Sequence, residues 1–459
     1  MQEQSPPPMR PRRTRHSSPG RECRGLLARF DESISQQTGA EDPATAIPDA
    51  VQQSAQYWLD TGNACYEQEA YEEALAAYKQ AVQITRVPLA IYTRMGDILF
   101  QLGYYDQALA AYEQVLQDEP EHVYAYNCSG NALYRLGLYA QARIAYQQAI
   151  RLEPHEAIFH YNKGLALIGL HRLDEALIAF MHALQCDPDD AYACNSAGNV
   201  LYRLCRYAQA LNAYEQAIAL KPDEEVFHYN SGKVLAFLNR YDESLLAFEQ
   251  AIRIDPRDAQ AYINMGNVLI SMQRYEEALQ KYKAAARIAP SAEAYNKQGV
   301  ILAQLNHPME ALAVHAQAIQ LDPTSASALT GIGHALYQLE CYYEALIAYR
   351  RAIKLEPGYA DAYNGRGNIL RDLTCYKEAY EDYSRALRLD PHCASALFWK
   401  RQVWVYMRTP MRGKLSEPTA DTAGQKQVSD VLSALIVRGQ TVFAALASWG
   451  NRTRELPDA

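Results

Sequence analysis

The chain has 459 residues, 49% of them hydrophobic, and a formal net charge of −9 at pH 7. This length and apolar content suffice for a sizeable core. No stretch approaches the roughly 18 continuous apolar residues of a membrane-spanning helix, so no transmembrane segment is expected. The acidic balance argues against a nucleic acid partner, because a phosphate backbone attracts a basic surface.

The first predicted element is a tail over residues 1–54. It starts MQEQSPPPMRPRRTRHSSPG, which is rich in Pro, Ser and Arg and contains no apolar segment typical of a signal peptide. A segment of this composition buries too little apolar surface to fold by itself. We therefore expect residues 1–54 to be disordered.

A repeat of about 34 residues follows the tail. Twelve residues after each repeated Gly comes an Ala or Ser, and twenty-four residues after it a Pro, except in the first repeat. Stepping along the chain at this period finds Gly62, Gly96, Gly130, Gly164, Gly198, Gly232, Gly266, Gly299, Gly333 and Gly367. A fixed period of this length indicates a stack of similar structural units.

Each repeat is predicted to form two helices. In YAYNCSGNALYRLGLYAQARIAYQQAIRLEP, apolar residues recur at helical spacing on both sides of a break at Gly137, and Pro154 ends the second helix. The repeated Gly is small because two helices joined by so short a turn must approach closely. Aromatic residues at a fixed place are expected to fill the gaps between the helices: Tyr112, Tyr146, Phe180, Tyr214, Phe248 and Tyr349.

This pattern of Gly, Ala, aromatic residue, Ala and Pro resembles the tetratricopeptide repeat family. The resemblance implies an all-α, right-handed superhelical solenoid in which the first helix of each repeat lines a concave groove. It also implies protein or peptide binding rather than catalysis. The Gln- and Tyr-rich style resembles bacterial, including cyanobacterial, examples. We place ten repeats at 55–88, 89–122, 123–156, 157–190, 191–224, 225–258, 259–291, 292–325, 326–359 and 360–393.

Two neighbouring repeats are copied within the array. Residues 123–190 and 191–258 are identical at 38 of 68 positions, whereas the adjacent repeats 123–156 and 157–190 match at only 9 of 34. The motif FHYN occurs at 159–162 and again at 227–230. Convergence on a family consensus does not explain identities confined to alternate repeats, so we infer that a two-repeat block was duplicated.

Three further elements are expected after the array. Residues 394–410 form a capping helix, in which Arg401 replaces the repeated Gly, and residues 411–424 form a linker. Residues 425–459 contain an amphipathic helix and a tail. This helix covers the open end of the solenoid or docks on a partner or on the groove.

No catalytic, cofactor or metal site is expected. HEAIFH resembles a zinc-protease motif, but its two His residues are five apart and Pro154 places the first in a turn. His160 and His228 are expected to be core residues that donate to nearby carbonyl groups. Nine scattered cysteines without a CxxC motif suit free thiols in a reducing cytoplasm.

By family analogy, the groove of the duplicated block carries the candidate partner-binding residues. Asn pairs with any peptide backbone, Tyr supplies flat contact area, and Arg recognises carboxylates. Consensus packing residues would show the same pattern, and at this stage the two interpretations are equally supported. The candidates are Tyr124, Asn127, Asn131, Tyr134, Arg135, Tyr161, Asn162, Tyr192, Asn195, Asn199, Tyr202, Arg203, Tyr229, Asn230 and Lys233.

The sequence therefore predicts a non-catalytic cytoplasmic scaffold that binds an extended protein segment with acidic groups. Residues 55–393 carry a net charge of −13, which disfavours nucleic acid as the ligand of the array. The carboxylate clamp of Hsp70/Hsp90 co-chaperones is not expected, because Leu59 stands where the clamp has Lys. The alternative function is an accessory subunit of an enzyme complex, such as a glycosyltransferase with its catalytic domain on another chain.

Overall fold

The computed structural model describes residues 49–408 except residue 86. These residues form 21 helices and no strand. The predicted linker at 411–424 and the C-terminal helix within 425–459 lie outside the described residues. The helices are α2 (Asp49–Glu67), α3 (Tyr71–Ile84), α4 (Leu89–Gln101), α5 (Tyr105–Asp118), α6 (Val123–Arg135), α7 (Tyr139–Leu152), α8 (Ala157–Gly169), α9 (Leu173–Cys186), α10 (Ala191–Arg203), α11 (Tyr207–Leu220), α12 (Glu225–Phe237), α13 (Tyr241–Ile254), α14 (Ala259–Ser271), α15 (Tyr275–Ile288), α16 (Ala292–Gln304), α17 (Pro308–Leu321), α18 (Ala326–Gln338), α19 (Tyr342–Leu355), α20 (Ala360–Asp372), α21 (Tyr376–Leu389) and α22 (Ala394–Arg408).

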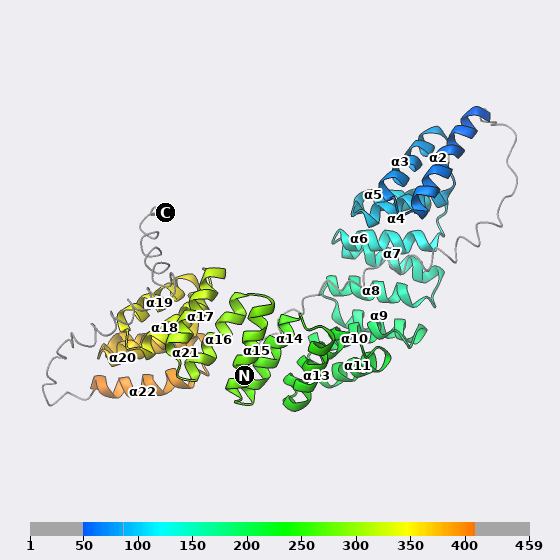
Figure 1. Ribbon diagram of the computed structural model, residues 1–459. Coiled ribbons are helices and arrows are strands. Elements are labelled where there is room, and N and C mark those ends of the chain that lie inside the picture. The colour runs from blue at the N-terminus through cyan, green and yellow to red at the C-terminus, as the bar shows by residue number, and fades with distance from the viewer. Residues whose placement is uncertain (1–48, 86, 409–459) are drawn as a thin grey trace, which may run out of the picture. The chain divides into compact units, whose positions relative to one another are not determined.

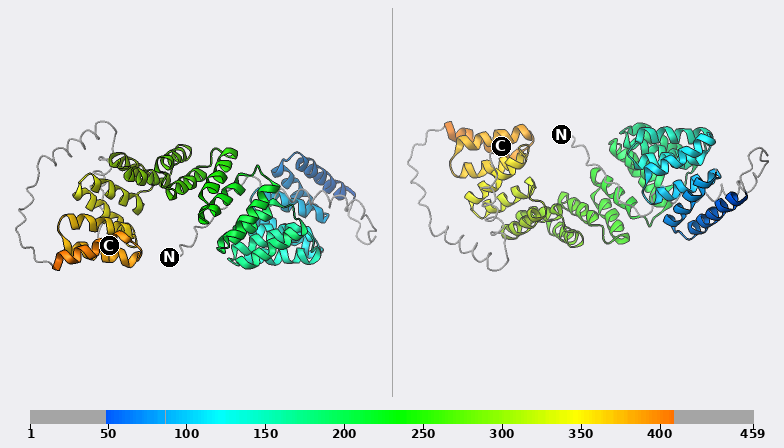
Figure 2. Two further views of the ribbon diagram at one scale, coloured as in Figure 1. Left: turned by 90° about the horizontal axis from the view of Figure 1, so that it is seen from below. Right: turned by 90° about the horizontal axis from the view of Figure 1, so that it is seen from above.

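The described chain divides into two compact bodies at Leu238. The N-terminal body contains α2 to α12, and the C-terminal body contains α13 to α22. Within each body the helices stack in chain order, each against its neighbours in the sequence (Figures 1 and 2). The even-numbered helices are the first helices of the repeats and the odd-numbered ones the second helices. The helix α2 begins at Asp49, earlier than the boundary at residue 55 expected from the sequence.

A tight turn joins the two helices of each repeat. After α6, Gly137 adopts a φ of 77°, and the backbone N–H of Leu138 donates to the carbonyl of Leu133 at 2.9 Å. This left-handed residue satisfies carbonyl groups that a helix end leaves without partners. Only the turns at Gly103 and Gly137 use glycine. The other eight turns hold a residue with a side chain at a φ of 58–62°.

In the repeats whose two helices lie within one body, the core is an aromatic ring packed against the repeated glycine. A Cβ atom added at Gly130 would lie 2.5 Å from Cε1 of Tyr146, and one at Gly198 would lie 2.7 Å from Cε1 of Tyr214. Carbon atoms do not approach so closely, so any larger residue would displace the ring. The expectation that the glycine permits close helix packing is therefore confirmed, and the ring is what requires it. The aromatic residues at this place are fully buried.

The last described helix, α22, packs against α21 and α20. It buries Ala396 and Val403, whereas Phe398 and Trp404 on its other side are exposed. None of the helices in 49–85 and 87–408 has the length and apolar content needed to cross a membrane.

Eight cysteines lie in the described part of the chain, and all are free thiols. Cys205 and Cys375 are exposed. The expectation of buried or half-buried thiols is therefore wrong for these two, which lie in turns between helices, whereas Cys341 in the equivalent turn of its repeat is buried.

Candidate protein-binding face

The first helices of the repeats lie on the inner side of each stack. In the N-terminal body α4 contacts α6, α6 contacts α8, and α10 contacts α12. In the C-terminal body α16 contacts α18, α18 contacts α20, and α20 contacts α22. No comparable contact joins consecutive second helices among the described residues. Because the helices on the inside of a curved stack approach most closely, the first helices line the concave side, which we call the inner face.

The structure separates the fifteen candidate residues into two groups. The buried group cannot offer its side chains to a ligand without rearrangement, and comprises Tyr124, Asn127, Asn131, Asn162, Asn195, Tyr202 and Asn230. The other group, which we call the open group, is half-buried or exposed, and comprises Tyr134, Arg135, Tyr161, Tyr192, Asn199, Arg203, Tyr229 and Lys233.

Asn131 and Asn199 hold their own repeats together. Asn131 Oδ1 accepts a hydrogen bond from the hydroxyl of Tyr146 at 2.8 Å, and Asn199 Oδ1 accepts one from Tyr214 at 2.8 Å. A buried hydroxyl needs such an acceptor, because an unmade hydrogen bond costs about 1–3 kcal/mol. Of the two interpretations left open by the sequence, these contacts favour packing for Asn131 and Asn199, because their carbonyl oxygens hold the core ring in place.

The same brace recurs at the ninth position of the first helices. Where the core aromatic residue is Tyr, an Asn or Asp usually accepts its hydroxyl. The pairs, at 2.7–2.8 Å, are Asn63–Tyr78, Asp97–Tyr112, Asn131–Tyr146, Asn199–Tyr214, Asn267–Tyr282 and Asn368–Tyr383. In the repeat whose ring is Phe180, which has no hydroxyl, the ninth residue is Leu165. The spacing of fifteen residues between the Asn or Asp and the Tyr is the feature of the sequence that indicates this contact.

Four more of the buried asparagines join neighbouring repeats. Asn162 Nδ2 donates to Asn127 Oδ1 at 3.0 Å, and Asn230 Nδ2 donates to Asn195 Oδ1 at 2.9 Å. The second pair is the copy of the first at a distance of 68 residues. These amides satisfy each other, so the duplicated block preserves a packing contact rather than four free peptide-binding groups.

The hydroxyl of Tyr124 also has a partner within the protein, the carboxylate of Asp97. This hydroxyl donates to both carboxylate oxygens of Asp97 at 3.0 Å, and Tyr112 donates to Oδ1 at 2.7 Å. Burial raises the pKa of Asp97 to about 7, and these hydrogen bonds oppose that rise. Asp97 therefore links three helices: α4, α5 and α6.

The open group combines aromatic rings with positive charge. The guanidinium of Arg135 lies 4.7 Å from the ring centroid of Tyr105. The ammonium of Lys233 lies 5.3 Å from the Tyr202 ring and 5.7 Å from the Tyr229 ring. No Asp or Glu among the described residues forms an ion pair with Arg135, Arg203 or Lys233.

The two histidines of the FHYN motifs donate to carbonyl groups, as expected. Nε2 of His160 lies 2.8 Å from the carbonyl oxygen of Pro154, and Nε2 of His228 lies 2.8 Å from that of Pro222. Both side chains are half-buried. The expectation that they are core residues is therefore wrong, because they tie the start of a first helix to the preceding turn.

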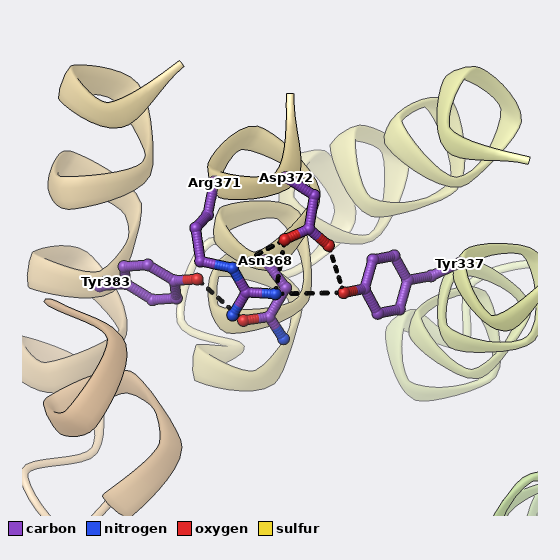
Figure 3. A network of polar contacts seen from close by, with 5 residues as sticks. All are labelled: Tyr337, Asn368, Arg371, Asp372 and Tyr383. Atoms are coloured by element: carbon purple, nitrogen blue, oxygen red, sulfur yellow. Dashed lines mark hydrogen bonds and ion pairs between the residues drawn. The ribbon is translucent and has the colours of Figure 1, made fainter. Parts of the chain in front are cut away.

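A polar network in the C-terminal body was not predicted from the sequence (Figure 3). Nη2 of Arg371 lies 2.7 Å from Asp372 Oδ1 and 3.2 Å from the Tyr337 hydroxyl, and Tyr337 donates to Asp372 Oδ2. The guanidinium also lies 3.8 Å from the ring centroid of Trp399. Burial, followed by the hydrogen bond to Asp372, raises the pKa of Tyr337 to about 12. The Arg371 charge is thus neutralised internally, and the network joins α18, α20 and α22.

The structure offers no site for a metal ion within its described part. In residues 49–408, apart from residue 86, no group of three or more His, Cys, Asp and Glu side chains could hold a metal.

Family comparison identifies the class of protein. Models described as tetratricopeptide repeat or TPR repeat match most of the chain, at 44–88, 93–150, 129–191, 195–259, 229–293, 263–326, 333–373 and 360–393. The chain therefore belongs to the tetratricopeptide repeat family. No match to a curated protein was found.

Solved structures similar to this chain are also repeat proteins. YrrB, titled a TPR protein with an unusual peptide-binding site, is 24% identical, with 42% of this chain and 99% of that chain covered and a TM-score of 0.34. MamA from Desulfovibrio magneticus RS-1 is 23% identical, with 39% and 99% covered and a TM-score of 0.36. A tetratricopeptide repeat protein from Parabacteroides merdae is 17% identical, with 57% and 98% covered and a TM-score of 0.43. At these identities the similarity concerns the fold alone.

Proposed function

We propose that this protein is a non-catalytic cytoplasmic scaffold that binds an extended protein segment on the inner face of its N-terminal body. The observation that supports this most is the open group on α6, α8, α10 and α12. There, aromatic side chains lie beside Arg135 and Lys233, and neither these two cations nor Arg203 has an acidic partner among the described residues. Aromatic and Arg side chains are also the types that dominate binding energy at protein interfaces.

The chemistry of this face favours a partner that carries acidic side chains. The rings supply flat contact area, and the three cations supply charge that nothing within the body neutralises. The internally satisfied asparagines hold the first helices in register beneath these side chains. A preformed surface of this kind reduces the entropy lost on binding.

Cross-linking of a purified complex tests this function. The intact chain would serve as bait, and each recovered protein would be purified and mixed with it before cross-linking and mass spectrometry. We expect cross-links to Lys163 and Lys233 on first helices and few to Lys79 and Lys281 on second helices. Cross-links concentrated on the second helices would place the partner on the outer surface and contradict the proposal.

A further inference from the structure

Lys233 occupies a place that has a packing role in other repeats. It is the ninth residue of α12, where six other first helices carry the Asn or Asp that accepts a core Tyr hydroxyl. The core aromatic residue of this repeat is Phe248, which has no hydroxyl to accept. In the other copy of the duplicated block, the equivalent residue is Leu165, beside Phe180. The other copy of the block therefore has an uncharged residue at this position of the sequence.

The surroundings of Lys233 do not neutralise its charge. The ammonium lies near the faces of Tyr202 and Tyr229, and no acidic side chain of the described residues pairs with it. The lysine is half-buried, and burial lowers its pKa. A desolvated ammonium is costly unless an anion accompanies it, and the rings offset only part of that cost. Lys163, half-buried on α8, differs because it donates to Gln147 Oε1 at 2.7 Å.

A second cation lies on the neighbouring first helix. Tyr202 is only 1% exposed, so it supplies a buried ring beside Lys233 and not a contact for the ligand. Arg203 follows Tyr202 in α10 and adds a second unpaired cation at the end of that helix.

We propose that Lys233, which lies beside the rings of Tyr202 and Tyr229, forms an anion subsite that receives the carboxylate of an Asp or Glu side chain from the bound segment. This proposal rests on the proposed function, because the subsite is one point on the inner face. The carboxylate supplies the counter-charge that Lys233 lacks. Among the ninth-position residues of α6, α8, α10 and α12, the cation occurs only on α12. The subsite therefore fixes where along the inner face an acidic residue of the partner lies.

Nuclear magnetic resonance of the full chain with labelled lysine side chains tests the subsite. The probes are two ten-residue Gly-Ser peptides with two central Tyr residues flanking a Glu in one and a Gln in the other. The Lys233→Leu variant assigns the Lys233 signal by its loss, and Leu is the residue that the other copy tolerates at this place. We expect the Glu peptide to shift the Lys233 signal saturably, with a dissociation constant about tenfold lower than that of the Gln peptide.

The variants separate this proposal from the proposed function. Lys233→Leu should remove the preference for Glu while leaving the helical circular dichroism and melting temperature unchanged or improved. Lys163→Leu should keep the preference, since Lys163 already has a partner. If both peptides shift inner-face signals equally, the subsite is wrong and the binding face stands. If neither peptide shifts any inner-face signal, both ideas fail. A third peptide with phosphoserine in place of Glu must bind more weakly than the Glu peptide; tighter binding would overturn the assignment to a carboxylate.

Discussion

At the residue scale, a single hydroxyl group decides which side chain is suitable at the ninth position of a first helix. Tyr146 has a hydroxyl and is paired with Asn131, whereas Phe180 has none and lies in the repeat with Leu165. The repeat of Tyr349 is an exception. Its ninth residue is His334, and the Tyr349 hydroxyl is buried without a partner.

The Asn–Tyr brace should contribute measurably to stability. Asn131→Ala should lower the free energy of unfolding by about 1–3 kcal/mol, because it leaves the Tyr146 hydroxyl buried without an acceptor. Asn131→Leu combined with Tyr146→Phe recreates the natural Leu165–Phe180 pair and should restore most of the loss. Urea denaturation followed by circular dichroism measures both. If Asn131→Ala has no effect, the asparagine is free for a ligand after all.

Asp97 should make stability depend on pH. Its folded pKa of about 7 lies above the ordinary value of 3.8, so folding favours the protonated form. The associated stability is fully present below pH 3.8 and is lost as the pH rises towards 7. Asp97→Asn introduces the residue that most other repeats have at this position. It should remove the loss of stability between pH 3.8 and 7 and raise the melting temperature above pH 7. A variant that follows the wild-type pH profile would show that the carboxyl is ionised in the fold.

His315 should make the protein sensitive to acid. It occupies the core ring position of its repeat, is fully buried, and neither ring nitrogen has a hydrogen-bond partner. Burial, with a smaller effect of His334, lowers its pKa to about 4. The neutral form is thus favoured in the fold, so stability is present above pH 6.5 and is lost as the pH falls towards 4.

The substitution His315→Phe tests this directly. Phe removes two unmatched polar atoms and should raise the free energy of unfolding at pH 7 by about 1–3 kcal/mol. A six-membered ring has room, because Tyr349 fits between Gly333 and Gly365 as His315 fits between Gly299 and Gly331. His315→Tyr should gain less, since the ninth residue here is Val300, which cannot accept a hydroxyl. If Phe is less stable than His, the site is too small and the burial argument fails.

At the scale of the helix pair, the sequence was sufficient to predict the helices, their turns and their pairing. The repeated Gly and the core aromatic residue lie where the two helices of a repeat are closest. The period of these residues in the sequence is therefore sufficient to predict the repeated helix pairs. The role of the inner-face residues was harder to predict, because a brace and a ligand contact both require polar side chains. Only the pairing of Tyr with Asn at a spacing of fifteen residues distinguishes them. The network around Arg371 uses the twelfth and thirteenth positions of the first helices, where Tyr134 and Arg135 also lie, and the sequence does not show which of these side chains pair with one another.

The turns between the two helices offer a test at this scale. Thr374 adopts a φ of 62°, which a β-branched residue disfavours. Thr374→Gly should therefore raise the free energy of unfolding by roughly 1 kcal/mol, whereas Gly137→Thr should lower it by a similar amount. Thermal melts of the two variants check the opposite signs. Equal destabilisation by both would mean that chain flexibility outweighs the strain at these turns.

At the scale of the whole molecule, one set of polar residues stabilises the stack of repeats and another set is available to a partner. The buried amides Asn127, Asn162, Asn195 and Asn230 fix the first helices against one another. Arg135, Arg203 and Lys233 on the inner face have no acidic partner among the described residues, although the array has a net charge of −13. That contrast is the physical basis for expecting an acidic protein segment at this face and not elsewhere on the array.

The most direct measurement compares partner affinity, as a function of salt, for two double variants of the full chain. We predict that Arg135→Ala with Arg203→Ala weakens binding about tenfold or more and flattens its salt dependence, because two unpaired inner-face charges are lost. Arg253→Ala with Arg388→Ala removes two exposed cations from second helices and should change neither. If the second pair weakens binding as much as the first, the inner face is not the binding surface.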